Sequence, residues 1–469
     1  MFYASRLSLI TLHPLRLPLD GHGCARLRSC IGLLWDIAYA LTEGRETISP
    51  RPRQQAIIFQ QMGDDVIGFL TYNENWGSGR RTAIPSRRSP VPSHYFQVRK
   101  PMQTEHRIVY REAGKFGGWP ANYGMWAWGD EIVVGFTQCT HLSLAGFHAR
   151  TRDLPAYPMQ ARSLDGGQSW ATIPTPAPSP GGRGFSADEH MKHELRVKQA
   201  IEEGLEPLPR PCPGHIDFTH PDFAMMVART GLGGGTIPWF YLSTDRAHTW
   251  QGPFSLPLFG QTGIEARTDA IINGAQDCML FVTAADEKGE EGKGVLLART
   301  TDGGQTFQLV SWVAVSETDE LIMPSSVRLD ERTIVTAIRC SVREGEFEET
   351  PTWIDLYAST DNGATFHHRA RPVPNAGSGG NPPALIQLHD GRLCLTYGYR
   401  AAPFGIQARL SEDGGQSWGN VIHLRDDGAC SDLGYPRTIQ RADGVLVTTY
   451  YFNDHQESER YIAATLWKP

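Results

Sequence analysis

Residues 411–418 read SEDGGQSW, and four variants of this phrase occur earlier in the chain. They are SLDGGQSW at 163–170, STDRAHTW at 243–250, TTDGGQTF at 300–307 and STDNGATF at 359–366. An aspartate followed by glycine can accept hydrogen bonds from the backbone of its own turn, glycine permits a positive φ, and a terminal Trp or Phe can pack between strands. We therefore interpret the five aspartates as structural turn residues rather than catalytic ones.

The spacing of the repeated turn indicates the architecture. Successive aspartates are separated by 80, 57, 59 and 52 residues, which suits four-stranded propeller blades with loop insertions. Alternating or apolar runs precede each turn, as in NPPALIQLHDGRLCLTYGYR at 381–400, which predicts a strand, a turn and a second strand. A last unit at 433–469 lacks the turn, and HRIVYREA at 106–113 is the predicted donor of its outer strand. We expect an all-β, six-bladed β-propeller over residues 106–469.

Residues 1–100 have a different character. Arg and Pro residues interrupt the apolar stretches of residues 1–21, so no clean signal-peptide core is present. This favours a location inside the cell, while a secreted location stays open if the N-terminus is incorrectly assigned. The apolar run at 31–41 is too short for a membrane span and contains Asp36. We predict an irregular or partly disordered extension, with a helix near 28–42.

Charge and cysteine content exclude several classes of partner. The net charge of -7 and the pI near 6.2 do not favour nucleic acid or an anionic membrane. The eight cysteines are scattered without metal-ligand spacing, and we predict neither a metal nor another cofactor. Cys278, Cys340 and Cys394 lie in apolar runs, where buried free thiols are expected. The sequence leaves the oligomeric state open.

The repeated turn, S-x-D-x-G-x-[ST]-[WF], resembles the Asp-box, or bacterial neuraminidase repeat, of the sialidase superfamily. The resemblance covers residues 106–469 and implies that the turns join the third and fourth strands at the periphery of each blade. It also implies a site on the propeller axis. In that family three arginines grip a substrate carboxylate, a tyrosine assisted by a glutamate is the nucleophile, and an aspartate is the acid/base.

Several residues match this pattern. Tyr435, in GYPRTIQ, matches the tyrosine that opens the family's last blade, and a neutral phenol suits attack on an anionic sugar. Arg339 ends the strand TAIR and Arg400 ends TYGYR, near the places of two family arginines, and guanidinium groups suit bidentate carboxylate binding. Arg437 and Arg267 stand at the starts of inner strands and are further candidates.

The sequence also departs from the family. Gly118 occupies the place of the arginine in the family's Arg-Ile-Pro motif, although Pro120 is kept. The family glutamate falls near Met323 and Pro324. The acid/base aspartate should lie within 137–158, which offers His141, His148 and Asp153 as candidates. These departures put a standard sialic-acid hydrolase in doubt.

Other polar residues near the axis offer substitutes. The segment HIDFTHPDF at 215–223 presents His220 and Asp222, and RTD at 267–269 presents Asp269. Either aspartate could act as the acid/base, and a histidine could abstract a proton in an elimination. The alternating His and Asp residues have no strong precedent as a zinc site. Trp119 and other aromatic residues near it could stack on a sugar ring.

Three functions follow from these candidates. The first is a sialidase-like exo-glycoside hydrolase acting on a carboxylate-bearing terminal sugar of a glycan. The second is a lyase on uronate polysaccharides that uses the same carboxylate clamp. The third is a glycan-binding propeller without catalytic activity.

Overall fold

The computed structural model describes residues 104–143, 148–178, 188–285, 288–343 and 350–469, together with the backbone of two short strands. Those strands, β1 (Ile57–Gln61) and β2 (Ile67–Thr71), pair as an antiparallel hairpin. The chain divides into two compact units, Met1–Phe96 and Gln97–Pro469. The rest of the predicted extension, including the helix expected near 28–42, lies outside the described residues.

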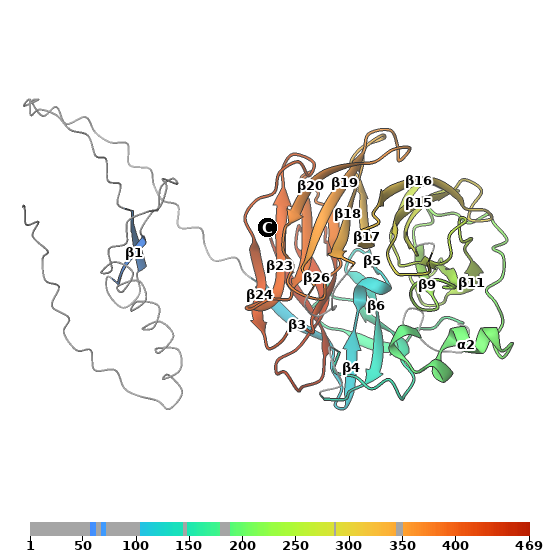
Figure 1. Ribbon diagram of the computed structural model, residues 1–469, viewed down its shortest axis with the longest axis horizontal. Coiled ribbons are helices and arrows are strands. Elements are labelled where there is room, and N and C mark those ends of the chain that lie inside the picture. The colour runs from blue at the N-terminus through green and yellow to red at the C-terminus, as the bar shows by residue number, and fades with distance from the viewer. Residues whose placement is uncertain are drawn as a thin grey trace, which may run out of the picture. The chain divides into compact units, whose positions relative to one another are not determined.

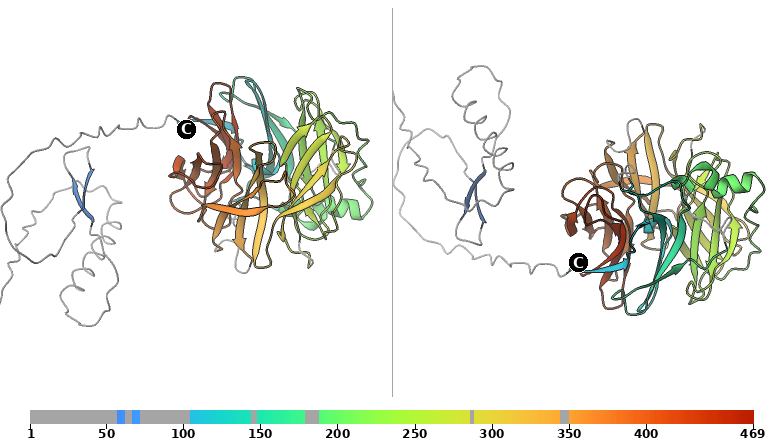
Figure 2. Two further views of the ribbon diagram at one scale, coloured as in Figure 1. Left: turned by 90° about the horizontal axis from the view of Figure 1, so that it is seen from above. Right: turned by 90° about the horizontal axis from the view of Figure 1, so that it is seen from below.

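The second unit is a six-bladed β-propeller, which confirms the predicted all-β class (Figures 1 and 2). Blade 1 consists of β4 (Lys115–Gly118), β5 (Met125–Trp128), β6 (Glu131–Thr140), β7 (Tyr157–Ser163) and β8 (Ala171–Pro174). Blade 2 consists of β9 (Ala224–Arg229), β10 (Pro238–Ser243) and β11 (Gln251–Ser255). Blade 3 consists of β12 (Ile264–Glu265), β13 (Ala270–Gly274), β14 (Asp277–Ala284), β15 (Gly294–Thr300) and β16 (Gln308–Val315).

The second half of the ring is more regular. Blade 4 consists of β17 (Asp319–Arg328), β18 (Ile334–Val342), β19 (Thr352–Ser359) and β20 (His367–Val373). Blade 5 consists of β21 (Ala384–Gln387), β22 (Leu393–Tyr399), β23 (Phe404–Ser411) and β24 (Ile422–Gly428). Blade 6 consists of β25 (Gly434–Gln440), β26 (Leu446–Phe452), β27 (Tyr461–Trp467) and β3 (Thr104–Tyr110). The helical segments are η1 (Pro120–Asn122), η3 (Asp188–His190), η4 (His193–Leu195) and α2 (Val197–Glu202).

The ring closes through strand β3, as predicted from HRIVYREA. This strand pairs antiparallel with β27, from Thr104 opposite Trp467 to Tyr110 opposite Ile462. Figure 1 shows β3 beside the strands from the end of the chain. Tyr110 and Ile462 share one buried core with Phe116 of blade 1, so the seam is packed as well as hydrogen-bonded.

The repeated turns join the last two strands of blades 1 to 5, and each aspartate bonds to its own turn. In all five turns one carboxylate oxygen accepts the backbone N–H of the residue four positions later, at 2.9–3.0 Å, and the other accepts that residue's hydroxyl at 2.5–2.6 Å. The two positions after each aspartate have positive φ, which explains the Gly-Gly pairs. In the second turn these positions are Arg246 and Ala247, which carry that strain without glycine.

The apolar cores lie between neighbouring sheets. Phe240 of blade 2, for example, packs in the same cluster as Leu280 of blade 3. Cys278, Cys340 and Cys394 are buried free thiols within these cores. Among the described residues there is no group of three or more His, Cys, Asp or Glu side chains arranged to hold a metal. No helix in the described ranges has both the length and the apolar character needed to cross a membrane.

Replacing one turn aspartate should lower the stability of the protein without changing any residue on the propeller axis. Asp302→Ala removes the acceptor of the Thr306 N–H and hydroxyl groups, and we expect a loss of about 1–2 kcal/mol in the free energy of unfolding. Urea denaturation would measure this loss, with the exposed neighbour Thr301→Ala as the matched control. An equal effect of both variants would contradict the structural role of the aspartate.

Candidate active site

Tyr435 begins the inner strand of blade 6 in a strained conformation. Its φ is 54°, and the preceding Gly434 has a φ of 111°. Asn381, fully buried in blade 5, accepts the Tyr435 N–H at 2.6 Å and donates to the Leu433 carbonyl at 3.0 Å. A Cβ atom at Gly434 would lie 2.3 Å from the Asn381 amide, so only glycine fits there. Such strain costs about 1–3 kcal/mol and persists only where neighbouring groups fix the backbone.

Three buried arginines surround Tyr435 from three consecutive blades. Arg229 ends β9, Arg267 follows β12, and Arg339 lies in β18. Their exposed fractions are 0%, 7% and 2%. Arg339 is hydrogen-bonded to Tyr435, and the other two lie close enough to interact electrostatically with it. We call this group, Tyr435 with Arg229, Arg267 and Arg339, the Tyr435 site.

Two of these guanidinium groups have N–H groups without a partner among the described residues. Arg229 donates from Nη2 to Glu189 at 2.7 Å, but its Nε and Nη1 have no acceptor, and neither does Nη1 of Arg267. Burial lowers the pKa of Arg267 to about 10, so it is still a cation at neutral pH. A buried cation without an acceptor is costly, and an anionic ligand group would remove that cost.

Three carboxyl groups, of Glu265, Glu291 and Glu320, lie close enough to the arginines to interact electrostatically with them. Burial, followed by the neighbouring charges of Glu265 and Glu320, raises the pKa of Glu291 well above its usual range. Burial also raises the pKa of Glu265, which accepts the Gly233 N–H at 3.0 Å. The raised pKa means that the Glu291 carboxyl keeps its proton to a higher pH than an ordinary glutamate does.

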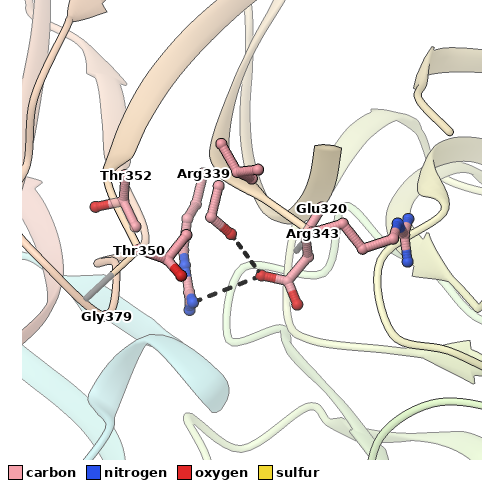
Figure 3. A pocket seen from close by; sticks show the side chains of 8 residues that line it. Glu320, Arg339, Arg343, Thr350, Thr352 and Gly379 are labelled. Atoms are coloured by element: carbon pink, nitrogen blue, oxygen red, sulfur yellow. Dashed lines mark hydrogen bonds and ion pairs between the residues drawn. The ribbon is translucent and has the colours of Figure 1, made fainter. Parts of the chain in front are cut away.

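Glu320 occupies a different setting. It accepts the Ser341 hydroxyl at 2.8 Å and lies 3.8 Å from Nη2 of Arg339 (Figure 3). Both Glu320 and Arg339 line a small pocket of about 150 Å³. Tyr435 and Glu320 thus contact the same guanidinium group.

Arg400 lies behind Tyr435, with its donors engaged by the protein. Its guanidinium donates to the carbonyls of Leu433, Gly379 and Gly380 at 2.6–3.0 Å, and to the Tyr451 hydroxyl at 2.6 Å. Its central carbon lies 5.6 Å from the centre of the Tyr435 ring. In this arrangement Arg400 fixes the loops that support Tyr435.

Asp432 is the centre of a buried network beside the Tyr435 site. It accepts hydrogen bonds from His148 at 2.7 Å, Arg460 at 2.9 Å and Tyr451 at 3.0 Å. Burial opposes its charge, but the charges and hydrogen bonds of these partners outweigh that effect and hold the pKa of Asp432 well below its usual range. The network connects blade 1 to blade 6.

Comparisons with known proteins found a family model and solved structures that resemble this propeller. Residues 223–448 match the family model of the BNR repeat-like domain. A crystal structure of a protein of unknown function from Dyadobacter fermentans is similar, with a TM-score of 0.56 and 22% identity over 78% of this chain and 98% of that one. What the chain shares with these proteins is the fold, a six-bladed β-propeller of the sialidase-like type.

Solved glycosidase structures are similar at lower identity. The Trypanosoma rangeli sialidase in complex with the inhibitor DANA is 11% identical with a TM-score of 0.50, over 77% of this chain and 59% of that one. This chain therefore spans about three fifths of that sialidase. An α-L-arabinofuranosidase from Fusarium graminearum has a TM-score of 0.47 at 11% identity, over 75% of this chain and 96% of that one. No curated protein matches the sequence.

The predicted site residues separate into several places in this sialidase-like propeller. Tyr435, Arg339 and Arg267 come together, with Arg400 behind them. Trp119 is buried, with a φ of 57°, and stacks on His190 at 3.7 Å instead of presenting a face to a ligand.

The remaining candidates do not reach Tyr435. Asp269, Arg437 and His220 line a separate cavity of about 410 Å³. Asp222 forms an ion pair with Arg246 at 2.5 Å. The side chain of Asp153 is 63% exposed and pairs with Lys192 at 2.6 Å.

Sequence reasoning missed Arg229, Glu291 and Glu320. Arg229 ends the strand AMMVAR, the position expected from the sequence for Arg339 and Arg400, so the same criterion could have found it. That expectation was wrong for Arg339, which lies within β18, before its end at Val342. Glu291 lies in the loop between β14 and β15 of blade 3, a loop position that should line the axis. Glu320 precedes an irregularity between Ile322 and Ser325, where Met323 has a φ of 55°, so counting along the strand misplaces it.

Removing the charge at the centre of the network should destabilise the protein. Asp432→Asn leaves Arg460 without its buried counter-ion, and we expect a loss of about 3–5 kcal/mol at neutral pH. Because the pKa of Asp432 is depressed in the folded state, its stabilisation is present above the unfolded pKa of about 4 and is lost as the pH falls. Unfolding measured from pH 7 down to pH 2 should therefore show a gap between variant and parent that is constant near neutral pH and closes progressively below about pH 5. Asp426→Asn, at an exposed position, is the control; a gap independent of pH would contradict the assignment.

Proposed function

We propose that this protein is a glycoside hydrolase that removes a terminal acidic sugar from a glycan. The observation that carries the proposal is the buried Arg267 guanidinium beside Tyr435, with its Nη1 donor unpaired among the described residues. Arg229, Arg267 and Arg339 would bind the carboxylate of the sugar, since guanidinium groups match carboxylates in charge and geometry. These arginines come from blades 2, 3 and 4.

In the proposed reaction Tyr435 is the nucleophile. Arg339 donates to its phenolic oxygen and stabilises the negative charge that forms there, while Glu320, which shares Arg339, takes up the phenolic proton. The tyrosine oxygen bonds to the anomeric carbon as the bond to the leaving oxygen breaks. Glu291 protonates that leaving oxygen, and water then hydrolyses the glycosyl-tyrosine. A neutral phenol approaches an anionic sugar without the repulsion that a carboxylate would meet.

The fold similarity to a sialidase supports glycosidase-type chemistry of this kind. The choice of an acidic sugar rests on the arginines. A lyase acting on uronates would use the same clamp, and a binding protein would use it without turnover, so the assay below includes both outcomes.

Loss of the phenolic hydroxyl should abolish turnover. We expect Tyr435→Phe to lower kcat/KM by at least about 10³-fold on 4-methylumbelliferyl glycosides of N-acetylneuraminic or glucuronic acid, because the covalent step loses its nucleophile. Released 4-methylumbelliferone measures hydrolysis, and Tyr157→Phe, on the exposed surface, is the matched control. An ultraviolet-absorbing unsaturated product from uronate oligosaccharides would identify a lyase instead. Binding without turnover in the parent protein would reject the hydrolase.

Replacing Arg267, whose Nη1 has no acceptor among the described residues, should change binding and stability in opposite directions. We expect Arg267→Met to weaken binding of N-acetylneuraminic or glucuronic acid by about 10–100-fold, while raising the free energy of unfolding by about 1–3 kcal/mol because a buried charge without an acceptor is removed. Calorimetric titration and urea denaturation would measure the two effects. Arg299→Met, at the ion pair with Asp277, is the control for binding. A variant that loses stability and keeps its affinity would show that Arg267 serves the fold.

A further inference from the structure

A second cavity of about 410 Å³ lies further along the inner strands than the Tyr435 site. Its lining includes residues of the inner strands β5, β13, β17, β21 and β25 and the segment that leads into β9. The volume falls within the range of about 300–1,000 Å³ found for small-molecule sites. Neither Tyr435 nor the three arginines around it contribute to this lining.

Arg437 separates the two regions of the axis. Its Nη2 donates to the Ala121 carbonyl in blade 1 and to the Thr268 carbonyl in blade 3, so this side chain of blade 6 connects three blades near the axis. Its Nε is buried and has no hydrogen-bond partner among the described residues. The guanidinium therefore forms a polar floor for the cavity.

The cavity contains matched polar groups. Asp269, 7% exposed, accepts the backbone N–H of Ser326 at 3.0 Å and its hydroxyl at 2.8 Å, and interacts electrostatically with Arg437. His220 lines the same cavity, and its Nδ1 accepts the Asp222 N–H at 3.2 Å, which leaves Nε2 for a ligand. One carboxylate and one guanidinium give the cavity no net charge, in contrast to the Tyr435 site.

The walls of the cavity are apolar and partly aromatic. Trp126 and Phe223 are half-buried, and Phe218 and Leu385 are buried. Trp126 is supported from behind by Trp250, with ring centroids 5.3 Å apart. Aromatic walls over a floor of hydroxyl, carboxylate and guanidinium groups match the apolar faces and the hydroxyl rim of a sugar ring.

We propose that this cavity is a second ligand site, which binds one or two neutral sugar units independently of the Tyr435 site. Asp269 accepts hydroxyl hydrogen bonds from the sugar, Arg437 donates through Nε, and Trp126 packs against the ring. An acidic sugar is disfavoured here because Asp269 would repel it and Arg437 is already shared with two carbonyls. The site accounts for Asp269, Arg437 and His220, which the proposed hydrolysis does not use.

The test is a titration of the full chain carrying Tyr435→Phe, which keeps catalysis out of the readout. The probes are the methyl glycosides of glucose, galactose and N-acetylglucosamine, and saturation-transfer NMR measures their binding. We expect at least one probe to bind, Asp269→Asn to weaken its affinity by about tenfold or more, and N-acetylneuraminic acid not to displace it. Ile272→Arg, at the exposed rim, should also block binding if Asp269→Asn fails to fold. Trp128→Ala is the matched control, because Trp128 lies on the same strand as Trp126 but outside the lining.

Three results would overturn the proposal: no binding of any of the three probes, binding insensitive to both Asp269→Asn and Ile272→Arg, or displacement by N-acetylneuraminic acid. None of them bears on turnover at Tyr435. Failure of this site and failure of the proposed hydrolase are therefore distinguishable.

Discussion

The pairing of β3 with β27 is the constraint on which the rest of the structure depends. Without it blade 6 would expose an unpaired strand edge, and the core that Tyr110 and Ile462 share with Phe116 would open to solvent. Closure fixes the angle between all six sheets, and so it brings the starts of the inner strands together on one axis. Tyr435 comes from blade 6, whereas Arg229, Arg267 and Arg339 come from blades 2, 3 and 4, and the closed ring brings the tyrosine and the arginines together.

Buried charged side chains lie near the axis, and the protein itself does not fully pair them. Five turn aspartates at the periphery bond within their own turns, whereas the buried arginines and glutamates near Tyr435 compensate each other only in part. Asp432 shows the opposite arrangement, since its four hydrogen-bond donors satisfy it fully enough to keep its pKa low. Unpaired buried charge next to a strained backbone is typical of a binding or catalytic site, and a satisfied buried network is typical of structural support.

Much of the fold could be predicted from the sequence because its signals are local. The Gly-Gly pairs follow from positive φ in the turns, and the missing turn of the last unit indicated where the ring closes. The site was less predictable because it depends on register. Tyr435 and Arg437 are two residues apart, yet the strand is irregular between Gly434 and Arg437. Tyr435 therefore lies in the Tyr435 site, whereas Arg437 is bonded to blades 1 and 3. Glu320 lies before a similar irregularity, and Arg400 could not be told from a ligand-binding arginine until its acceptors were known.

The seam also gives the propeller a circular order. Thr104 lies opposite Trp467, so the first and last strands of the domain are hydrogen-bonded neighbours and the six sheets have no intrinsic first member. A short linker between these positions would make the backbone continuous around the ring, and new ends could then be opened at a loop between two other blades. The order of the blades along the chain could therefore change without changing the geometry of the axis, which depends only on all six blades being present and joined.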